Sequence, residues 1–335
     1  MNRLFLPSEK PVEEALSGLA LAHPGLLTLH EDPLYVTARE RHPGRRVGLV
    51  SGGGSGHEPL HTGFVGAGML DAAAPGRVFV SPHNRQVYEA SKAVAGPDGV
   101  LHIVKNYTGD RINFGIAAER LRADGMPVAR VLVDDDLATE SDETATGRRG
   151  TGATVIVEKL LGGAADAGAG LDELAELGAR ITAASRSLAV AARAQTSPAR
   201  GGAAFPLPEG TLEYGVGIHG ERAATTVQHP GFEQLVDRMT HQVADALPST
   251  AGSVLLLVNG LGATTLLELH AVHARVSRLL GERGLDVAGR LVGSYVPALD
   301  MSGFSLTLTA LRDDWAAHWH APARTVAFPA QEAVR

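Results

Sequence analysis

The chain has 335 residues, 40 of them glycine, with no cysteine and a formal net charge of −7. This length suggests two domains; the lack of cysteine excludes disulfides, a thiol nucleophile and a cysteine-type zinc site, and the acidic balance argues against a nucleic-acid partner. We find no signal peptide and no apolar run near the roughly 20 residues that a membrane span needs, so we expect a soluble, cytoplasmic protein without a membrane partner.

Extended and helical segments alternate through the first half of the chain. A first helix is predicted over 11–22, where Pro24 and Gly25 end the pattern. The predicted strands are 46–50, 77–80, 100–104 and 128–133, and the predicted helices between them are 60–69, 87–94 and 112–121. This alternation indicates an α/β fold with parallel or mixed sheets flanked by helices. Ligands bind beyond the carboxyl ends of such strands, where polar clusters occur in this chain.

The second half begins after two long predicted helices, at 151–167 and 171–194. Residues 196–210 are rich in Pro, Gly, Ala and Ser and form the expected connector. We therefore expect one α/β domain over 1–195 and a second over 211–335. The elements predicted in the second domain are strands at 215–220, 253–258, 287–296 and 304–311 and helices at 232–247 and 266–280.

The most distinctive stretch, 47–59, reads Val-Gly-Leu-Val-Ser-Gly-Gly-Gly-Ser-Gly-His-Glu-Pro. Glycines let a ligand approach the backbone closely, and His57 stands at the expected start of a helix, where unpaired amides would point at a ligand. A phosphate loop would need Lys-Ser/Thr in the place of His57 and Glu58. A dinucleotide site would need an acidic residue after a second strand, and Asp71 does not fit that place. The stretch favours a small polyhydroxylated ligand over a nucleotide.

Four side chains are candidates for chemistry. His57 can simply cap amides, but its setting in the glycine loop favours a functional role. Asp110, taken alone, is better explained as a helix N-cap, and Lys105 is either a strand-end charge or a group that orients a ligand hydroxyl. His219 lies between glycines in a predicted strand, and a buried core histidine and a reactive one explain it equally well.

Two charged clusters have structural explanations that we favour. Asp134–Asp136 offers the carboxylates that Mg²⁺ prefers, but adjacent strand residues face opposite ways. We therefore favour a role for these aspartates in helix capping and in a turn, and no metal site is expected in this chain. Arg148 and Arg149 fit a phosphate contact or, as we favour, solvent or a partner surface.

Seven short motifs occur in order along the chain, at 52–59, 105–110, 133–136, 147–150, 215–221, 259–264 and 299–304. Together they resemble the K subunit of dihydroxyacetone kinase, and the resemblance covers nearly the whole chain. It implies two α/β domains and a homodimer, with a short ketose such as dihydroxyacetone held between the domains.

The resemblance also implies roles for single residues. His219 would attack the ketone carbon and form a hemiaminal, which selects for ketones and aldehydes. The implied substrate-binding residues are Gly54, Ser55, Gly56, His57, Lys105 and Asp110. His57 and Asp110 would also handle the proton of the hydroxyl that accepts phosphate.

The resemblance implies that this chain binds no cofactor itself. ATP or ADP with Mg²⁺ would be carried by a separate all-helical L subunit, so this chain alone is expected to be inactive. Phosphoryl transfer is mostly positioning and charge neutralisation, which allows the acceptor and the donor to lie on different chains. The donor would be ATP or a phosphocarrier M subunit of the sugar phosphotransferase system.

Two departures from the family pattern leave alternatives open. The stretch 81–86, Ser-Pro-His-Asn-Arg-Gln, places His83 and Arg85 where the family usually has Ser-Pro-Thr/Ser-Pro and an acidic residue. A larger ketose such as erythrulose, or a phosphorylated ketose, is therefore an alternative substrate. The chain also has no long insertion between Met239 and Val254, so partner docking is expected to differ from that of family members with an insertion there. Two other classes are a non-catalytic ketose-sensing co-activator of transcription and a lipid-binding protein of related fold, which the polar pocket residues oppose.

Overall fold

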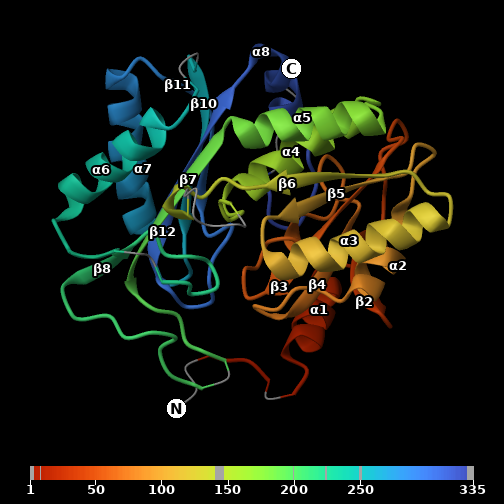
Figure 1. Ribbon diagram of the computed structural model, residues 1–335, viewed down its shortest axis with the longest axis horizontal. Coiled ribbons are helices and arrows are strands. Elements are labelled where there is room, and N and C mark those ends of the chain that lie inside the picture. The colour runs from red at the N-terminus through yellow and green to blue at the C-terminus, as the bar shows by residue number, and fades with distance from the viewer. Residues whose placement is uncertain are drawn as a thin grey trace. The chain divides into compact units, whose positions relative to one another are not determined.

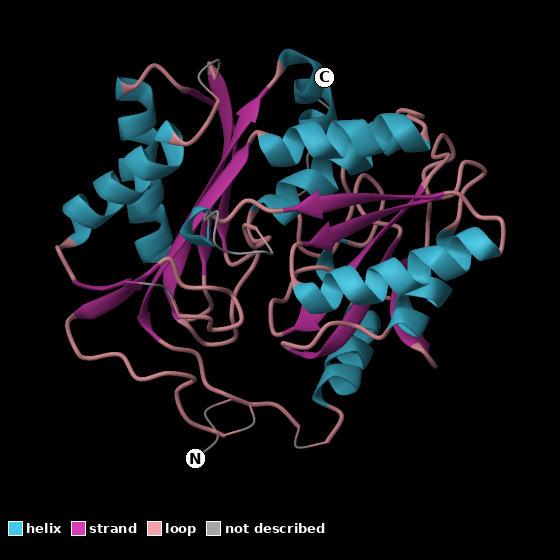
Figure 2. Cartoon of the chain, in the orientation of Figure 1, coloured by secondary structure: helices cyan, strands magenta, loops and turns pink. Residues whose placement is uncertain are grey.

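The computed structural model describes residues 4–7, 9–139, 147–198, 200–222, 225–248 and 251–329. The fold consists of two six-stranded mixed sheets flanked by helices (Figures 1 and 2). The first unit comprises Leu6–Val133, Thr154–Arg180 and Asp314–Arg335, and the second comprises Met1–Phe5, Asp134–Ala153 and Ile181–Asp313. The predicted fold class is confirmed, since both units are α/β.

The sheet of the first unit has the strand order β1-β2-β4-β3-β5-β6. The strands are β1 (Leu27–Glu31), β2 (Leu34–Ala38), β3 (Gly48–Ser55), β4 (Ala72–Val78), β5 (Val100–Lys105) and β6 (Val128–Val133). The last four are parallel to one another, while the β1–β2 hairpin adds an antiparallel edge. The carboxyl ends of β3 and β5 therefore lie at the same edge of the sheet.

The helices of the first unit are α1 (Pro11–Ala22), α2 (Asn84–Val94), α3 (Thr108–Ala123), α4 (Ala153–Asp166), α5 (Leu171–Ala183) and α8 (Asp313–His320). Side chains alternate between the two faces of a strand. Val100 and Val104 of β5 share a buried cluster with Phe114 of α3. Lys105, the next residue, points to the opposite face and contacts His61 there. This alternation places Lys105 on the α4 side of the sheet, because His61 in turn contacts Glu158 of α4.

The sheet of the second unit has the order β11-β10-β12-β7-β8-β9 and is antiparallel except for the β10–β11 pair. Its strands are β7 (Ser185–Arg193), β8 (Thr211–Tyr214), β9 (Thr225–Gln228), β10 (Ser253–Gly260), β11 (Asp286–Gly293) and β12 (Ser302–Leu311). The helices α6 (Phe232–Asp245) and α7 (Leu266–Glu282) lie side by side and pack their apolar faces against the sheet (Figure 1). None of the described helices in either unit is long and apolar enough to cross a membrane.

Two predicted helices are wrong. The stretch 60–69 forms a short 3₁₀ turn, η1 (Thr62–Phe64), in place of a helix. The helix predicted over 171–194 ends at Ala183, and β7 follows it. In β7, Leu188 and Val190 join one buried cluster while Ala189 and Ala191 join another. A strand buried on both faces is apolar throughout, so its sequence lacks the alternation that separates a strand from a helix.

The observed division of the chain also differs from the expected boundary. β7 pairs with β12 and β8, which places it in the second sheet ahead of the predicted connector. Residues 196–210 lie entirely within the second unit, and the chain returns to the first unit at Asp314. A composition shift marks a loop, but it does not show which sheet the flanking strands join.

Candidate functional site

The glycine segment lies inside the sheet of the first unit. All eight residues of β3 are buried, with β4 on one side and β5 on the other. A Cβ at Gly52 would lie 2.3 Å from the backbone oxygen of Ala74, so the close approach of β4 requires glycine there. The prediction of an exposed loop that opens a helix is therefore wrong. His57 is fully buried, with its ring centroid 5.1 Å from that of Phe79.

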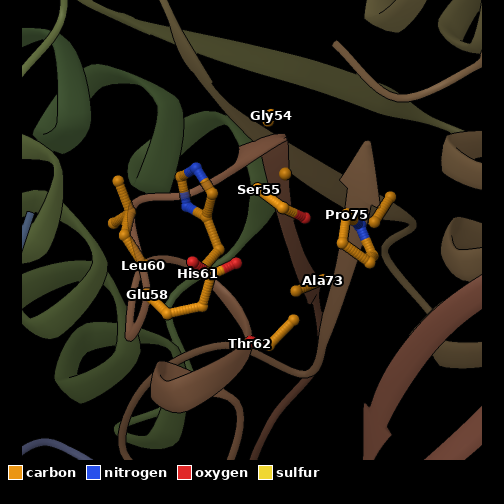
Figure 3. A pocket seen from close by; sticks show the side chains of 11 residues that line it. Gly54, Ser55, Glu58, Leu60, His61, Thr62, Ala73 and Pro75 are labelled. Atoms are coloured by element: carbon orange, nitrogen blue, oxygen red, sulfur yellow. The ribbon is translucent and has the colours of Figure 1, made fainter. Parts of the chain in front are cut away.

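A pocket lies beside the end of β3, and Figure 3 shows Glu58, Leu60 and His61 on one side of it and Ala73 and Pro75 on the other. Its lining residues are Gly52, Gly53, Gly54, Ser55, Glu58, Leu60, His61, Thr62, Ala73, Ala74 and Pro75. Two of the expected ligand groups already have partners within the chain. The Ser55 hydroxyl donates to the Gly76 carbonyl at 2.7 Å, and the Gly56 amide donates to Glu58 at 2.9 Å. The Ser55 hydroxyl therefore remains available only as an acceptor.

The structure brings Lys105 and Asp110 together, with Lys105 Nζ 3.6 Å from Asp110 Oδ2. Both side chains are buried. Asp110 is the third residue of α3, and the N-cap is Tyr107, so the capping explanation for Asp110 is wrong. Asp110 Oδ1 is buried and has no hydrogen-bond partner among the described residues. A buried carboxylate oxygen is costly to leave unsatisfied, which favours Asp110 as an acceptor for a ligand hydroxyl.

Two further residues of the first unit belong to this cluster, and sequence analysis missed both. His61 Nε2 lies 2.8 Å from Lys105 Nζ, and His61 Nδ1 lies 2.6 Å from Glu158 Oε1. Glu158 is fully buried. The signal that could have identified it is a carboxylate in the middle of the largely apolar helix 153–166, at a position that amphipathic spacing does not expose.

His219 lies in the second unit, in the loop after β8 rather than in a strand. Its side chain is 19% exposed, which argues against a packed core histidine. His219 Nδ1 is 3.1 Å from Glu221 Oε1, and the His219 backbone amide donates to Glu221 Oε2 at 2.9 Å. Sequence analysis missed Glu221, although it stands two residues after His219.

The Glu221 contact fixes the state of the imidazole. Burial alone would raise the pKa of Glu221, but the hydrogen bond and the charge of His219, together with Arg149, lower it to about 2. An ionised carboxylate only accepts hydrogen bonds, so the Nδ1 atom of His219 carries the proton. In the neutral imidazole this tautomer places the lone pair of the ring on Nε2.

The unusual stretch 81–86 has a structural role. His83 is the N-cap of α2: its Nδ1 accepts from the Arg85 amide at 3.1 Å, and its own amide donates to Gln86 at 2.9 Å. Arg85 pairs with the exposed Asp32 at 3.2 Å. Arg85 and His83 line a different pocket from the one beside Gly54. The guanidinium group therefore offers no support for a phosphorylated substrate in the glycine pocket.

The three aspartates at 134–136 in the second unit cap a helix and form ion pairs, which is the structural role that we favoured from the sequence. Asp135 accepts from the Thr151 amide at 2.7 Å and from the Ala153 amide at 3.0 Å, at the start of α4. Asp136 pairs with Arg149 at 2.7 Å, and Arg148 pairs with Asp134. The two arginines thus have partners within the chain, and the interpretation of them as solvent-facing residues is wrong. Among the described residues, no group of three or more His, Asp or Glu side chains is arranged to hold a metal.

The two units define the class of protein: an α/β protein with a buried lysine–aspartate pair in the first unit and a histidine–glutamate pair in the second. A family model for the Dak1 domain matches residues 17–327. The chain belongs to the Dak1 domain family.

Several relatives in this family match over nearly their whole length. The dihydroxyacetone-binding subunit DhaK of the PEP-dependent dihydroxyacetone kinase of Escherichia coli is 40% identical, covering 98% of this chain and 99% of its own. The corresponding subunit of the PTS-dependent dihydroxyacetone kinase 1 of Listeria innocua is 41% identical, with 98% and 100% covered.

Solved structures show the same fold. The dihydroxyacetone kinase of C. freundii is 34% identical with a TM-score of 0.91, covering all of this chain and 62% of that protein. The dihydroxyacetone kinase operon co-activator Dha-DhaQ is 32% identical with a TM-score of 0.88, covering 96% and 98%. A DegV family protein from Corynebacterium glutamicum, 12% identical with a TM-score of 0.51 over 80% of this chain and 99% of that one, shares the fold alone.

Proposed function

We propose that this chain is the ketose-binding subunit of a dihydroxyacetone kinase. It binds a short ketose covalently through His219 and presents the terminal hydroxyl of that ketose for phosphorylation. The observation that carries the proposal is the contact between His219 Nδ1 and Glu221, which favours the tautomer with its lone pair on Nε2. The full-length similarity to dihydroxyacetone-binding subunits supports the choice of ketose.

The chemistry at His219 is addition to a carbonyl. The Nε2 lone pair forms a bond to the ketone carbon, the C=O π electrons move to the oxygen, and that oxygen takes up a proton to give the hemiaminal. The imidazole gains positive charge as the bond forms, and the carboxylate of Glu221 beside Nδ1 stabilises that charge. Glycerol has no carbonyl and cannot form the bond, so this step provides substrate selection.

In this proposal the groups of the first unit bind oxygens of the ketose. Gly54, Ser55, Gly56 and Lys105 bind them, and Asp110 and His57 take the proton of the hydroxyl that accepts phosphate. The buried Asp110 Oδ1, which has no partner among the described residues, is the acceptor for that hydroxyl. A positioned base contributes roughly 10²–10⁴-fold to such a step.

The nucleotide belongs to another polypeptide in this proposal. We expect ATP or ADP with Mg²⁺ on a separate L subunit, and a homodimer of this chain as the form that docks with it. The donor is ATP or a phosphocarrier M subunit. The bacterial relatives include subunits of both PEP-dependent and PTS-dependent dihydroxyacetone kinases, which supports the phosphocarrier.

A non-catalytic regulator is the second candidate, because the operon co-activator Dha-DhaQ has a closely similar structure. A regulator needs the covalent adduct at His219 but no base for the phosphate-accepting hydroxyl. The buried pair of Lys105 and Asp110 therefore favours the kinase subunit.

The experiment that tests the proposal is a ketose panel with the cognate L subunit, with ATP and a phosphocarrier supplied in turn. We expect phosphorylation of dihydroxyacetone, slower phosphorylation of erythrulose, and no phosphorylation of glycerol. This chain without the L subunit should transfer no phosphate. Consumption of ATP by this chain alone would contradict the proposal, and an adduct without turnover in any combination would favour the regulator.

Two neighbouring glycines provide a matched pair of variants. A Cβ at Gly53 would lie 2.2 Å from Lys105 Nζ, whereas a Cβ at Gly52 would meet the backbone of Ala74. Gly53→Ala displaces the flexible end of a side chain, so we expect the fold to persist while ketose affinity, measured by calorimetry, falls about tenfold or more, as loss of a charged hydrogen bond predicts. Gly52→Ala should instead lower the free energy of unfolding by about 1–3 kcal/mol in urea titrations. Equal ketose affinity in Gly53→Ala and the wild type would contradict a role for Lys105.

A further inference from the structure

Two charged motifs of the sequence, at 133–136 and 147–150, meet beside the loop that carries His219. Arg149 pairs with Asp136, and its Nε and Nη2 atoms lie 2.8 Å and 2.7 Å from the same carboxylate oxygen. The two side chains are 11% and 3% exposed. A buried ion pair is often no more stabilising than apolar residues of the same size, because both charges lose their hydration. Stability alone is therefore a poor explanation for this pair.

Asp136 is fixed in place by the backbone around it. Its Oδ1 atom accepts from the Ala138 amide at 3.0 Å, and its own amide donates to the Arg149 carbonyl at 3.0 Å. Burial raises the pKa of the Asp136 carboxyl to about 6, although the charge of Arg149 acts to lower it, so the carboxylate is ionised at neutral pH. A guanidinium group is planar and its donors point in fixed directions. Asp136 therefore sets the directions of the other donors of Arg149.

Those other donors are directed at residues 215–221, which we call the histidine loop. Arg149 Nη2 donates to the carbonyl of Gly215, the first residue of the loop, at 3.0 Å. The loop turns back on itself, because the Gly217 amide donates to the Glu221 carbonyl at 2.9 Å. Arg149 thus holds the start of a tight turn whose end carries Glu221.

Arg149 also lies beside the carboxylate of Glu221. A Cβ at Gly217 would be 2.4 Å from Arg149 Nη1 and 2.1 Å from Glu221 Oε2, so both groups lie against the same glycine. Glu221 in turn accepts from the backbone amide of His219 and contacts its Nδ1 atom. A continuous set of neighbours therefore leads from Asp136 to the imidazole, and all of them belong to the second unit.

The charges in this set suit an imidazole that becomes positive as it adds to a ketone. Burial alone would raise the pKa of Glu221, but the hydrogen bond and the charge of His219, and then the charge of Arg149, lower it to about 2. Asp136 offsets the charge of Arg149, so one net negative charge remains to face the imidazolium. Without Asp136, the guanidinium would cancel the effect of Glu221.

We propose that the pair of Arg149 and Asp136 positions the histidine loop and thereby keeps Glu221 against the Nδ1 atom of the imidazole. Both are positioning residues, since they act through Glu221 and need not touch the ketose. The inference rests on the proposed function, because this imidazole is the one that adds to the ketone. It gives both charged motifs a role in substrate binding.

Gly217→Ala tests the inference without removing a charged group. The added methyl would displace the flexible ends of Arg149 and Glu221, and Gly217 has no left-handed backbone, so we expect the fold to persist. In the full-length chain without ketose, ¹⁵N NMR of labelled histidine should show that His219 loses its preference for a proton on Nδ1. Affinity for dihydroxyacetone, measured by calorimetry, should fall about tenfold or more, as loss of a charged hydrogen bond predicts.

The control is Gly281→Ala, at an exposed position in α7 where a Cβ meets open space, and it should change neither readout. Lower affinity with a wild-type tautomer would mean that the methyl merely blocks the ketose, and an altered tautomer with wild-type affinity would mean that binding does not depend on Glu221. Either result would overturn the inference, as would no change in both. An altered tautomer in Gly217→Ala, when the wild type itself binds no ketose, would leave the positioning intact and reject the proposed function.

Replacing the whole pair separates positioning from stability. In the double variant Arg149→Met with Asp136→Asn, the amide oxygen can still accept from Ala138 and no buried charge is left unpaired. We expect a melting temperature near that of the wild type, together with the same loss of tautomer preference and of ketose affinity as in Gly217→Ala. Arg278→Met, at an exposed position in α7, is the matched control. A folded double variant with the wild-type tautomer and affinity would overturn the inference.

Discussion

Replacing His219 with alanine is expected to abolish the covalent adduct with dihydroxyacetone and, with it, nearly all phosphorylation. The methyl group offers no lone pair to the ketone carbon, so the ketose is neither fixed nor distinguished from glycerol. We expect kcat/KM with the cognate L subunit to fall roughly a thousandfold or more. Crystals soaked with dihydroxyacetone should show no density joined to residue 219.

The fold should survive this change, because His219 lies in a loop and is partly exposed. His270→Ala, on the exposed face of α7, is the matched control and should retain wild-type activity. A His219→Ala variant that keeps substantial activity and the same melting temperature would show that the hemiaminal is not needed for turnover.

Asp110→Asn is expected to separate binding from turnover. The amide has the shape of the carboxylate but cannot take up the proton of the hydroxyl that accepts phosphate. The adduct at His219 should still form, while kcat falls roughly 10²–10⁴-fold. Single-turnover measurements with the L subunit, alongside crystals of the ketose-soaked variant, give both quantities.

The control for this substitution is Asp172→Asn, an equivalent change at an exposed position in the first turn of α5. It should leave both the adduct and kcat unchanged. Loss of the adduct in Asp110→Asn would indicate that Asp110 mainly holds Lys105 and the ketose in place, and kcat near the wild-type value would exclude Asp110 as the base.

Much of the fold could be predicted from the sequence where one face of an element is polar. Helices such as α1 and α7, with a clear 3.6-residue pattern, begin where they were predicted. The prediction was wrong at β7 and at the region after β3, where most side chains are buried and periodicity carries little signal. The boundary between the two units was also predicted wrongly, because the local sequence does not show which distant segments pair as strands.

The candidate site shows the same limit. Glycines and polar residues after predicted strands singled out His57, Lys105 and Asp110, and the structure brings the last two together. No local pattern predicts that Lys105 and Glu158, which are 53 positions apart, both contact His61. Such a contact depends on which helix covers which face of the sheet, and that is decided by tertiary packing.

The bond at His219 is tested most directly by a crystal structure of the chain soaked with dihydroxyacetone. We predict continuous electron density at single-bond distance between Nε2 of that imidazole and the former ketone carbon, with Glu221 still held at Nδ1. A dihydroxyacetone molecule bound elsewhere, or one seated next to an unmodified ring, would contradict the covalent mechanism.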